Sequence, residues 1–97
     1  MKRAIWNGTV LAESDDIVEV EGNAYFPRSV LNMDHFTPSS HQTICPWKGT
    51  ANYFDIEVNG ERLRNGAWYY PQPKDAASHI QNRVAFYGDV TVEEETI

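Results

Sequence analysis

The sequence predicts a mainly β protein, α+β by content, with two packed antiparallel sheets. Short turns connect the strands, and one short helix accompanies the sheets. Short runs of alternating apolar and polar residues recur along the chain, separated by turn signals. The pairs Asn7-Gly8 and Asn59-Gly60 are typical of two-residue hairpin turns, because both turn positions favour positive φ. Hydrophobic residues form 41% of the 97 residues and aromatic residues 12%, which is enough for the core of one small domain.

Four short strands are expected in the N-terminal quarter of the chain. Residues 3–6 form the first strand, and residues 9–13 return beside it. Residues 18–21 alternate apolar and acidic side chains, so one face of this strand contacts the core and the other contacts water. Gly22-Asn23 closes a second hairpin, which leads into a strand over residues 24–26.

The middle of the chain is expected to begin with irregular structure and to continue as a strand. Residues 29–36 are expected to be irregular or to form one helical turn, and residues 38–40, Pro-Ser-Ser, to be a loop. Residues 42–45 approach as a strand, and Pro46 favours an extended backbone at Cys45.

A long hairpin follows this approach. Residues 51–58 alternate strictly and form a strand, and residues 62–70 return beside it. Within the return, Asn65-Gly66 predicts a β-bulge or an early turn.

The C-terminal third contains the predicted helix. Pro71-Gln72-Pro73 interrupts the sheet, and a helix is expected over about residues 74–82, with Pro73 suited to its first position. Four residues form its narrow apolar stripe: Ala76, Ala77, Ile80 and Val84. Residues 84–87 and 90–92 then supply a final β segment. We therefore expect one domain over residues 1–92 and a flexible acidic tail over residues 93–97.

Charge and hydropathy exclude several classes of partner. The net charge is −6 and the eight basic residues are scattered, which argues against nucleic-acid binding. No apolar run approaches ~18 residues, and no charged-then-apolar leader is present, so we expect neither a membrane span nor secretion. The single cysteine cannot form an internal disulfide, which suits the cytoplasm.

Four segments together resemble one bacterial family, domain of unknown function 427. They are residues 4–8 (Ala-Ile-Trp-Asn-Gly), 25–27 (Tyr-Phe-Pro), 45–50 (Cys-Pro-Trp-Lys-Gly-Thr) and 68–71 (Trp-Tyr-Tyr-Pro). The resemblance extends over about residues 1–92. It implies a β-tent-like fold, in which two antiparallel sheets pack at an angle.

The resemblance also raises expectations that this chain does not meet. Many β-tent domains carry a zinc held by paired Cys-x-x-Cys motifs, but one cysteine cannot build such a site, so we expect no zinc and an aromatic core in its place. The family also bears a nucleotidyltransferase label. That chemistry needs two or three convergent carboxylates, whereas Asp55 and Glu57 share a strand face that is ordinarily solvated.

Aromatic residues around the Cys-Pro-Trp-Lys-Gly segment are candidates for a ligand pocket. Trp68 and Tyr70 share one strand face, and Trp47 lies in a loop that could reach them. Lys48 could stand at the mouth of the pocket and bind an anionic group. The other candidate lining residues are Cys45, Tyr53 and, as a second cation, Arg28. The alternative is that these aromatic side chains form the core.

Two further functional hypotheses remain open. If the protein is an enzyme, Cys45 is the candidate nucleophile, with Lys48 close enough to stabilise a thiolate, although free cysteines are more often buried as small apolar residues. The three histidines, His35, His41 and His79, lack metal-ligand spacing and suit surface or capping roles. The other reading is an interaction domain that uses an exposed sheet edge. We expect no metal and no cofactor, and the oligomeric state, monomer or weak dimer, stays open.

Overall fold

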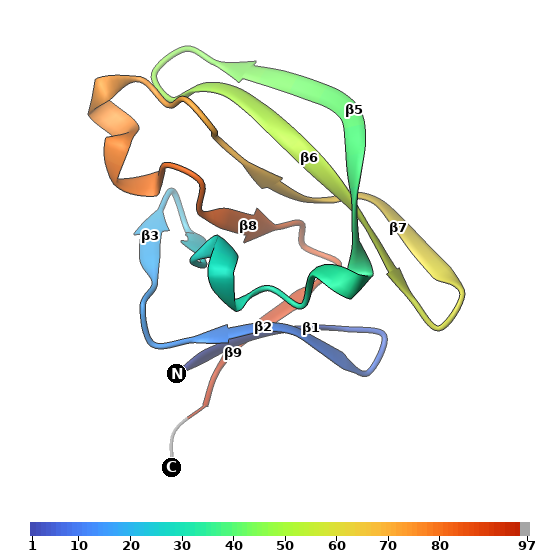
Figure 1. The fold of residues 1–97 in the computed structure, drawn as a ribbon. Coiled ribbons are helices and arrows are strands. Elements are labelled where there is room, and N and C mark those ends of the chain that lie inside the picture. The colour runs from blue at the N-terminus through green and yellow to red at the C-terminus, as the bar shows by residue number, and fades with distance from the viewer. Residues whose placement is uncertain (96–97) are drawn as a thin grey trace.

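The computed structural model describes residues 1–95, which contain nine β-strands and three short 3₁₀ segments (Figure 1). The strands are β1 (Lys2–Trp6), β2 (Thr9–Ser14), β3 (Val18–Val20), β4 (Asn23–Tyr25), β5 (Phe36–Cys45), β6 (Gly49–Val58), β7 (Glu61–Tyr69), β8 (Val84–Phe86) and β9 (Thr91–Glu94). The 3₁₀ segments are η1 (Arg28–Val30), η2 (Met33–His35) and η3 (Asp75–Ile80).

Two antiparallel sheets face each other across the core, as the sequence predicts. One has the order β2-β1-β9, and the other has the order β5-β6-β7-β8. The β3-β4 hairpin extends the second sheet, because Phe26 and Val84 exchange two backbone hydrogen bonds of 2.8 Å at the free edge of β8. Figure 1 shows the four-stranded sheet above the N-terminal sheet, with the chain of η1 and η2 between them.

The core divides into two clusters with different neighbours. The larger lies between the two sheets and contains edge-to-face pairs of phenylalanines, Phe26 with Phe86 and Phe36 with Phe54, at centroid distances of 5.6 and 5.7 Å. The smaller lies beneath η3 and includes the buried residues Tyr25, Ala51, Tyr70, Ala77, Ile80 and Ala85. Most aromatic residues of the chain are therefore shared between the two clusters, whereas Trp47 and Tyr87 are exposed.

The local turn signals are confirmed. Asn7 and Gly8 have φ of 50° and 74°, as a type I′ turn requires at both positions. Asn59 and Gly60 repeat this geometry with φ of 53° and 80°. The predicted bulge is present at Asn65, which has φ of 53° and lies where the pairing of β6 with β7 shifts register.

Two predicted boundaries in the first half of the chain are wrong. The second hairpin turns at Glu21-Gly22, one residue earlier than expected, because Asn23 is paired with Val20 inside the sheet. The Pro38-Ser39-Ser40 segment belongs to β5 and is not a loop. Proline is tolerated there because β5 is an edge strand and its register shifts between Pro38 and Gln42.

The predicted helix is shorter and tighter than expected. Residues 75–80 form 3₁₀ turns with a break at Ala77, where φ is −117° and ψ is 20°. Six residues are too few to offset the nucleation of an α-helix, so i→i+3 bonds such as that from Gln81 N to Ser78 O are made instead. Ala77 and Ile80 are buried as predicted, but Ala76 is exposed and Val84 lies in β8.

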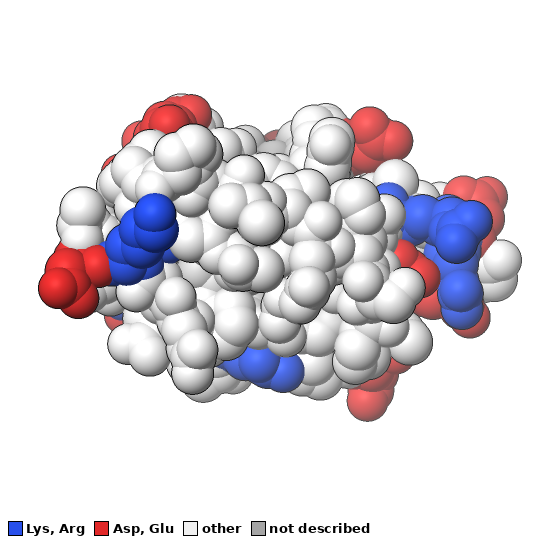
Figure 2. Space-filling model, turned by 90° about the horizontal axis from the view of Figure 1, so that it is seen from above, with Lys and Arg blue, Asp and Glu red and all other residues white. Residues whose placement is uncertain are grey.

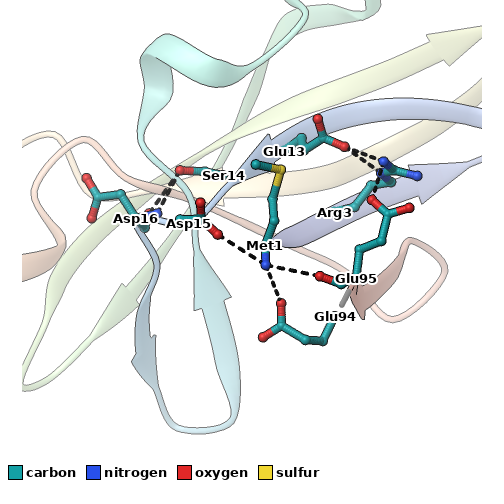
Figure 3. A network of polar contacts seen from close by, with 8 residues as sticks. All are labelled: Met1, Arg3, Glu13, Ser14, Asp15, Asp16, Glu94 and Glu95. Atoms are coloured by element: carbon teal, nitrogen blue, oxygen red, sulfur yellow. Dashed lines mark hydrogen bonds and ion pairs between the residues drawn. The ribbon is translucent and has the colours of Figure 1, made fainter. Parts of the chain in front are cut away.

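The C-terminal strand extends into the predicted tail. β9 pairs with β1 as far as Glu94, so the strand includes two of the five residues expected to be flexible, while residues 96–97 lie outside the described part. Figure 3 shows the polar contacts at this end of the sheet. The amino group of Met1 lies 3.1 Å from Asp15 and 2.8 Å from Glu94, and Arg3 contacts Glu13 and Glu95.

Candidate functional site

The Cys45–Gly49 segment forms the tight connection from β5 to β6. Gly49 closes it with φ of +115°, a conformation that side-chain-bearing residues rarely adopt. Lys74 holds the connection from outside, because its backbone N–H donates to Lys48 O at 2.9 Å and its ammonium donates to Pro46 O at 2.5 Å. The segment that follows β7 therefore fixes the position of this loop.

Lys48 is the buried charge of the site. Only 7% of the residue is exposed, and its ammonium donates a hydrogen bond to the carboxylate of Glu21. The same ammonium lies 5.5 Å from the ring centroids of both Trp47 and Tyr70, within cation–π range. Burial acts to lower the pKa of Lys48, but the bond to Glu21 and the phenol groups of Tyr25 and Tyr70 outweigh it, so the pKa is raised.

Glu21 is the partner of this lysine and stands at the tip of the β3-β4 hairpin. Among residues 1–95, the positive-φ residues other than glycine are four asparagines and Glu21, whose φ is 54°. Its side chain is 53% exposed. The hydrogen bond from Lys48 lowers the pKa of the Glu21 carboxyl, with a smaller effect of the same sign from Trp47.

Two buried tyrosines, Tyr25 and Tyr70, pack on the core side of the site. Tyr25 is fully buried, and its hydroxyl accepts a hydrogen bond of 3.2 Å from the indole N–H of Trp68. Tyr70 is 5% exposed, and burial raises the pKa of its phenol. The hydrogen bond orients the indole of Trp68, and burial restricts the ring of Tyr70.

An open cavity of about 390 Å³ lies beside Lys48. Its walls are largely aromatic and include Tyr53 and Tyr87, whose rings lie 6.4 and 5.8 Å from that of Trp68. The lining residues are Asn23, Lys48, Tyr53, Trp68, Tyr70, Phe86, Tyr87 and Gly88. The hydroxyl of Tyr53 is hydrogen-bonded to that of Thr43 at 2.9 Å, so this wall is also held from outside.

A second open cavity, of about 320 Å³, adjoins the first because both are lined by Tyr53 and Tyr87. It also contains Arg64, Asp89 and His41, and the His41 ring lies 4.7 Å from that of Tyr53. The two cavities thus share an aromatic border on the side of the four-stranded sheet that bears Tyr53 and Trp68.

The structure brings together four of the seven residues predicted to bind a ligand. Lys48, Tyr53, Trp68 and Tyr70 line the first cavity. Trp47 lies over the Lys48 ammonium without lining the cavity.

The remaining two predicted residues do not line this cavity. Cys45 is partly buried and packs against the smaller core cluster. Arg28 is placed elsewhere, because its guanidinium lies 5.3 and 5.1 Å from the rings of Phe54 and Tyr69. Tyr69 points to the face opposite that of Trp68 and Tyr70, as alternation along a strand requires.

Several residues of the site were not predicted from the sequence. They are Glu21 and Tyr25, which contact Lys48 and Trp68, and the cavity-lining residues Asn23, Phe86, Tyr87 and Gly88. Tyr25 is the last residue of β4 and belongs to a motif segment, and Tyr87 is an aromatic residue directly after β8, so a sequence signal was present for both. Glu21 carried none, because it lies 27 residues from Lys48 and reaches it only when the hairpin docks beside β8.

The strand carboxylates and His35 have ordinary partners. Arg62 lies 3.7 Å from Asp55 and 3.1 Å from Glu57, and the backbone N–H of Asn65 donates to Asp55 at 2.8 Å. His35 is hydrogen-bonded to the carbonyl of Glu57 at 2.9 Å. Within residues 1–95, no group of three or more His, Cys, Asp and Glu side chains is placed to hold a metal ion.

The fold and the site define a small, mainly β domain with an aromatic-lined cavity beside a buried lysine. Residues 2–96 match the model of the family described as Domain of unknown function (DUF427), and the chain belongs to this family. No curated protein matches the sequence. In the described part of the chain, no helix is long and apolar enough to cross a membrane.

Proposed function

We propose that the domain binds a small molecule that combines an aromatic or apolar ring with an anionic group. The observation that carries the proposal is the buried ammonium of Lys48 at one side of a cavity walled by Tyr53, Trp68, Tyr70 and Tyr87. Ligand sites commonly combine large apolar contact area with a few fixed polar groups. We place this binding in the cytoplasm, where the unpaired thiol of Cys45 stays reduced.

Preorganised walls favour binding in this cavity. Hydrogen bonds hold Trp68 to Tyr25 and Tyr53 to Thr43, at 3.2 and 2.9 Å. A ligand that enters therefore orders few side chains, which reduces the entropy lost on association. The rings offer edge and face contacts to a planar group, and Lys48 supplies the charge that would orient an acid.

A thermal-shift screen with aromatic carboxylates, nucleotides and sugar phosphates tests this proposal. A ligand at about 100 times its Kd adds ~2.7 kcal/mol, which raises the Tm of so small a domain by roughly 10 °C. Tyr87→Ala removes a ring that is 55% exposed and borders both cavities, so the shift should be lost in this variant. Trp47→Ala, which removes the ring over Lys48, should reduce it.

Val10→Ala is the matched control, since Val10 is an exposed apolar residue on β2, in the other sheet. This variant should keep the full shift. A panel that leaves the Tm of the wild type unchanged would contradict the proposal, as would equal shifts in Tyr87→Ala and Val10→Ala.

A second candidate function is association through the edge strand β5. Ile44 on this strand is 80% exposed, the largest exposure among the large apolar residues of the described chain. Figure 2, which looks down on the molecule from above the view of Figure 1, shows a broad central area without charged side chains. A second copy could pair along β5, and Ile44→Lys should then turn a dimer into a monomer in light scattering. A monomeric wild type would rule out this pairing.

The two enzymatic readings have less support. A thiol nucleophile needs a base, and within residues 1–95 no hydrogen bond joins the Cys45 side chain to a histidine. Nucleotidyl transfer needs convergent carboxylates for metal ions, whereas Asp55 and Glu57 both contact Arg62.

A further inference from the structure

We propose that Lys48 forms a carboxylate-binding subsite which Glu21 occupies as a built-in competitor, so that a ligand carboxylate enters by displacing the tip of the β3-β4 hairpin. The inference deepens the proposed function, because it names the anionic group and the element that controls access to it. The side chain of Glu21 shows which chemistry the subsite accepts: a carboxylate on a short, flexible stem.

An anion is required beside Lys48 at all times. The ammonium is withdrawn from water, with 7% of the residue exposed, and rings of Trp47 and Tyr70 lie 5.5 Å away. Aromatic faces attract a cation but do not replace its lost hydration. Removing Glu21 without a substitute therefore leaves an unpaired buried charge, which is the situation that a free carboxylate would relieve.

Glu21 is suited to leave this position. Its side chain is 53% exposed, and within residues 1–95 its one ion pair is with Lys48. Its backbone has φ of 54°, in the left-handed region, where the other non-glycine residues of the described chain are all asparagines. The hairpin turn is exposed, and a Cβ at Gly22 would meet nothing within 4 Å, so the tip has open space beside it.

The hairpin also connects the subsite to the cavity. Asn23, two residues beyond Glu21, lines the same cavity as Lys48. A ligand whose ring lies against Trp68 and Tyr87 would thus meet the hairpin at the end where Lys48 stands. Glu21 and a ligand carboxylate exclude each other. The apparent affinity of the ligand therefore equals its intrinsic affinity multiplied by the fraction of molecules in which Glu21 has left Lys48.

Stabilisation by acetate is the deciding experiment. Glu21→Gly removes the internal carboxylate, leaves its space empty and suits the positive φ. The Tm of this variant should rise as sodium acetate replaces sodium chloride at constant ionic strength, while the Tm of the wild type should not change. Adding Lys48→Met to Glu21→Gly should abolish the rise. A Glu21→Gly variant that does not respond to acetate, or responds equally without Lys48, would overturn the inference.

Benzoate and benzyl alcohol link the subsite to the cavity. Glu21→Gln keeps the bulk of the side chain and removes its charge, so it should bind benzoate at least about 10-fold more tightly than the wild type. Benzyl alcohol, which has the ring without the charge, should not distinguish the two proteins. Glu19→Gln is the control, because Glu19 lies on the same hairpin but contacts Lys2 at 3.4 Å, and it should bind benzoate as the wild type does.

The two proposals fail in different ways. If acetate stabilises Glu21→Gly but neither aromatic probe binds any form of the protein, the subsite stands and the aromatic pocket falls. If ligands bind with full sensitivity to Tyr87→Ala, but Glu21→Gln leaves the affinity for benzoate unchanged and acetate has no effect on Glu21→Gly, the pocket stands and the competitor falls.

Discussion

In the Lys48–Glu21 pair, each charged group is stabilised by the other. Lys48 is buried between two rings, and its ammonium is stabilised by a carboxylate from a different hairpin. Glu21 in turn adopts a backbone conformation that favours glycine or asparagine. The two-residue turn requires this conformation, as it does at Asn7-Gly8 and Asn59-Gly60, and the ion pair with Lys48 is a contact that the Glu21 side chain makes from the turn.

The free energy of unfolding should depend on pH through the Lys48–Glu21 ion pair. The pKa of Glu21 is lower in the folded protein than its ordinary value of 4.5, so its contribution is fully present above that value and is lost as the pH falls through the folded pKa. The pKa of Lys48 is raised, so its contribution is present below 10.5 and is lost as the pH rises through its folded pKa. Glu21→Gln removes the acidic part of this dependence.

Urea unfolding at neutral pH and at about pH 3 measures it. The loss of unfolding free energy on acidification should be smaller in Glu21→Gln than in the wild type. Equal losses would show that Lys48 does not stabilise the Glu21 carboxylate. Glu94 also has a lowered pKa, through the Met1 amino group, so part of the loss should remain in the variant.

Sequence reasoning found side chains of the site more readily than it found their partners. Trp68 and Tyr70 share a face because alternation along a strand requires it, and Lys48 follows Trp47 in a distinctive segment. Glu21 could not be predicted as the partner of Lys48, because this pairing depends on how the β3-β4 hairpin docks against β8. A residue pair separated by 27 positions leaves no local pattern.

At the scale of elements, local chemistry decides which predictions succeed. The hairpins at Asn7-Gly8 and Asn59-Gly60 form because their residues adopt positive φ without assistance. The short helix is present as the six-residue 3₁₀ segment η3, which breaks at Ala77, and Ala77 and Ile80 are buried as the apolar stripe indicates. Pro38 was misassigned because proline disfavours central strands and not edge strands.

The bulge in β7 offers an element-scale prediction. A Cβ added at Gly66 would lie 2.8 Å from Leu63 Cδ2 and 2.9 Å from Ile56 Cδ1. Gly66→Ala should therefore destabilise the protein by about 1–3 kcal/mol through overpacking. Urea unfolding measures the change.

Gly88→Ala is the matched control for this change. A Cβ at Gly88 meets nothing within 4 Å, so its effect should stay within about 0.5 kcal/mol. If both variants are equally stable, then Leu63 and Ile56 move aside easily, and the bulge does not require a glycine for reasons of packing.

At the scale of the whole molecule, the larger core cluster unites the two sheets. Ala4, Leu11 and Ala12 come from the N-terminal sheet and pack with Phe54 and other residues of the four-stranded sheet. The two-sheet arrangement was predictable from the number of short strands and from the family resemblance. Which strands close each sheet was not, because the pairing of β1 with β9 joins the two ends of the chain.

This shared core predicts that the sheets unfold together. Leu11 is 1% exposed on β2, and Leu11→Ala should cost about 2–5 kcal/mol by opening a cavity. Trp6 packs against the larger cluster and Trp68 against the smaller, so each reports on a different part of the molecule. Variants that retain Trp6 or Trp68 as their single tryptophan, with Trp47 also replaced, should show the same urea midpoint. Leu11→Ala should lower both midpoints equally, because a two-state domain transmits a core defect to every probe. A Trp68 midpoint that stays in place while that of Trp6 falls would mean that the four-stranded sheet, with the Lys48 cavity, is stable without the N-terminal sheet.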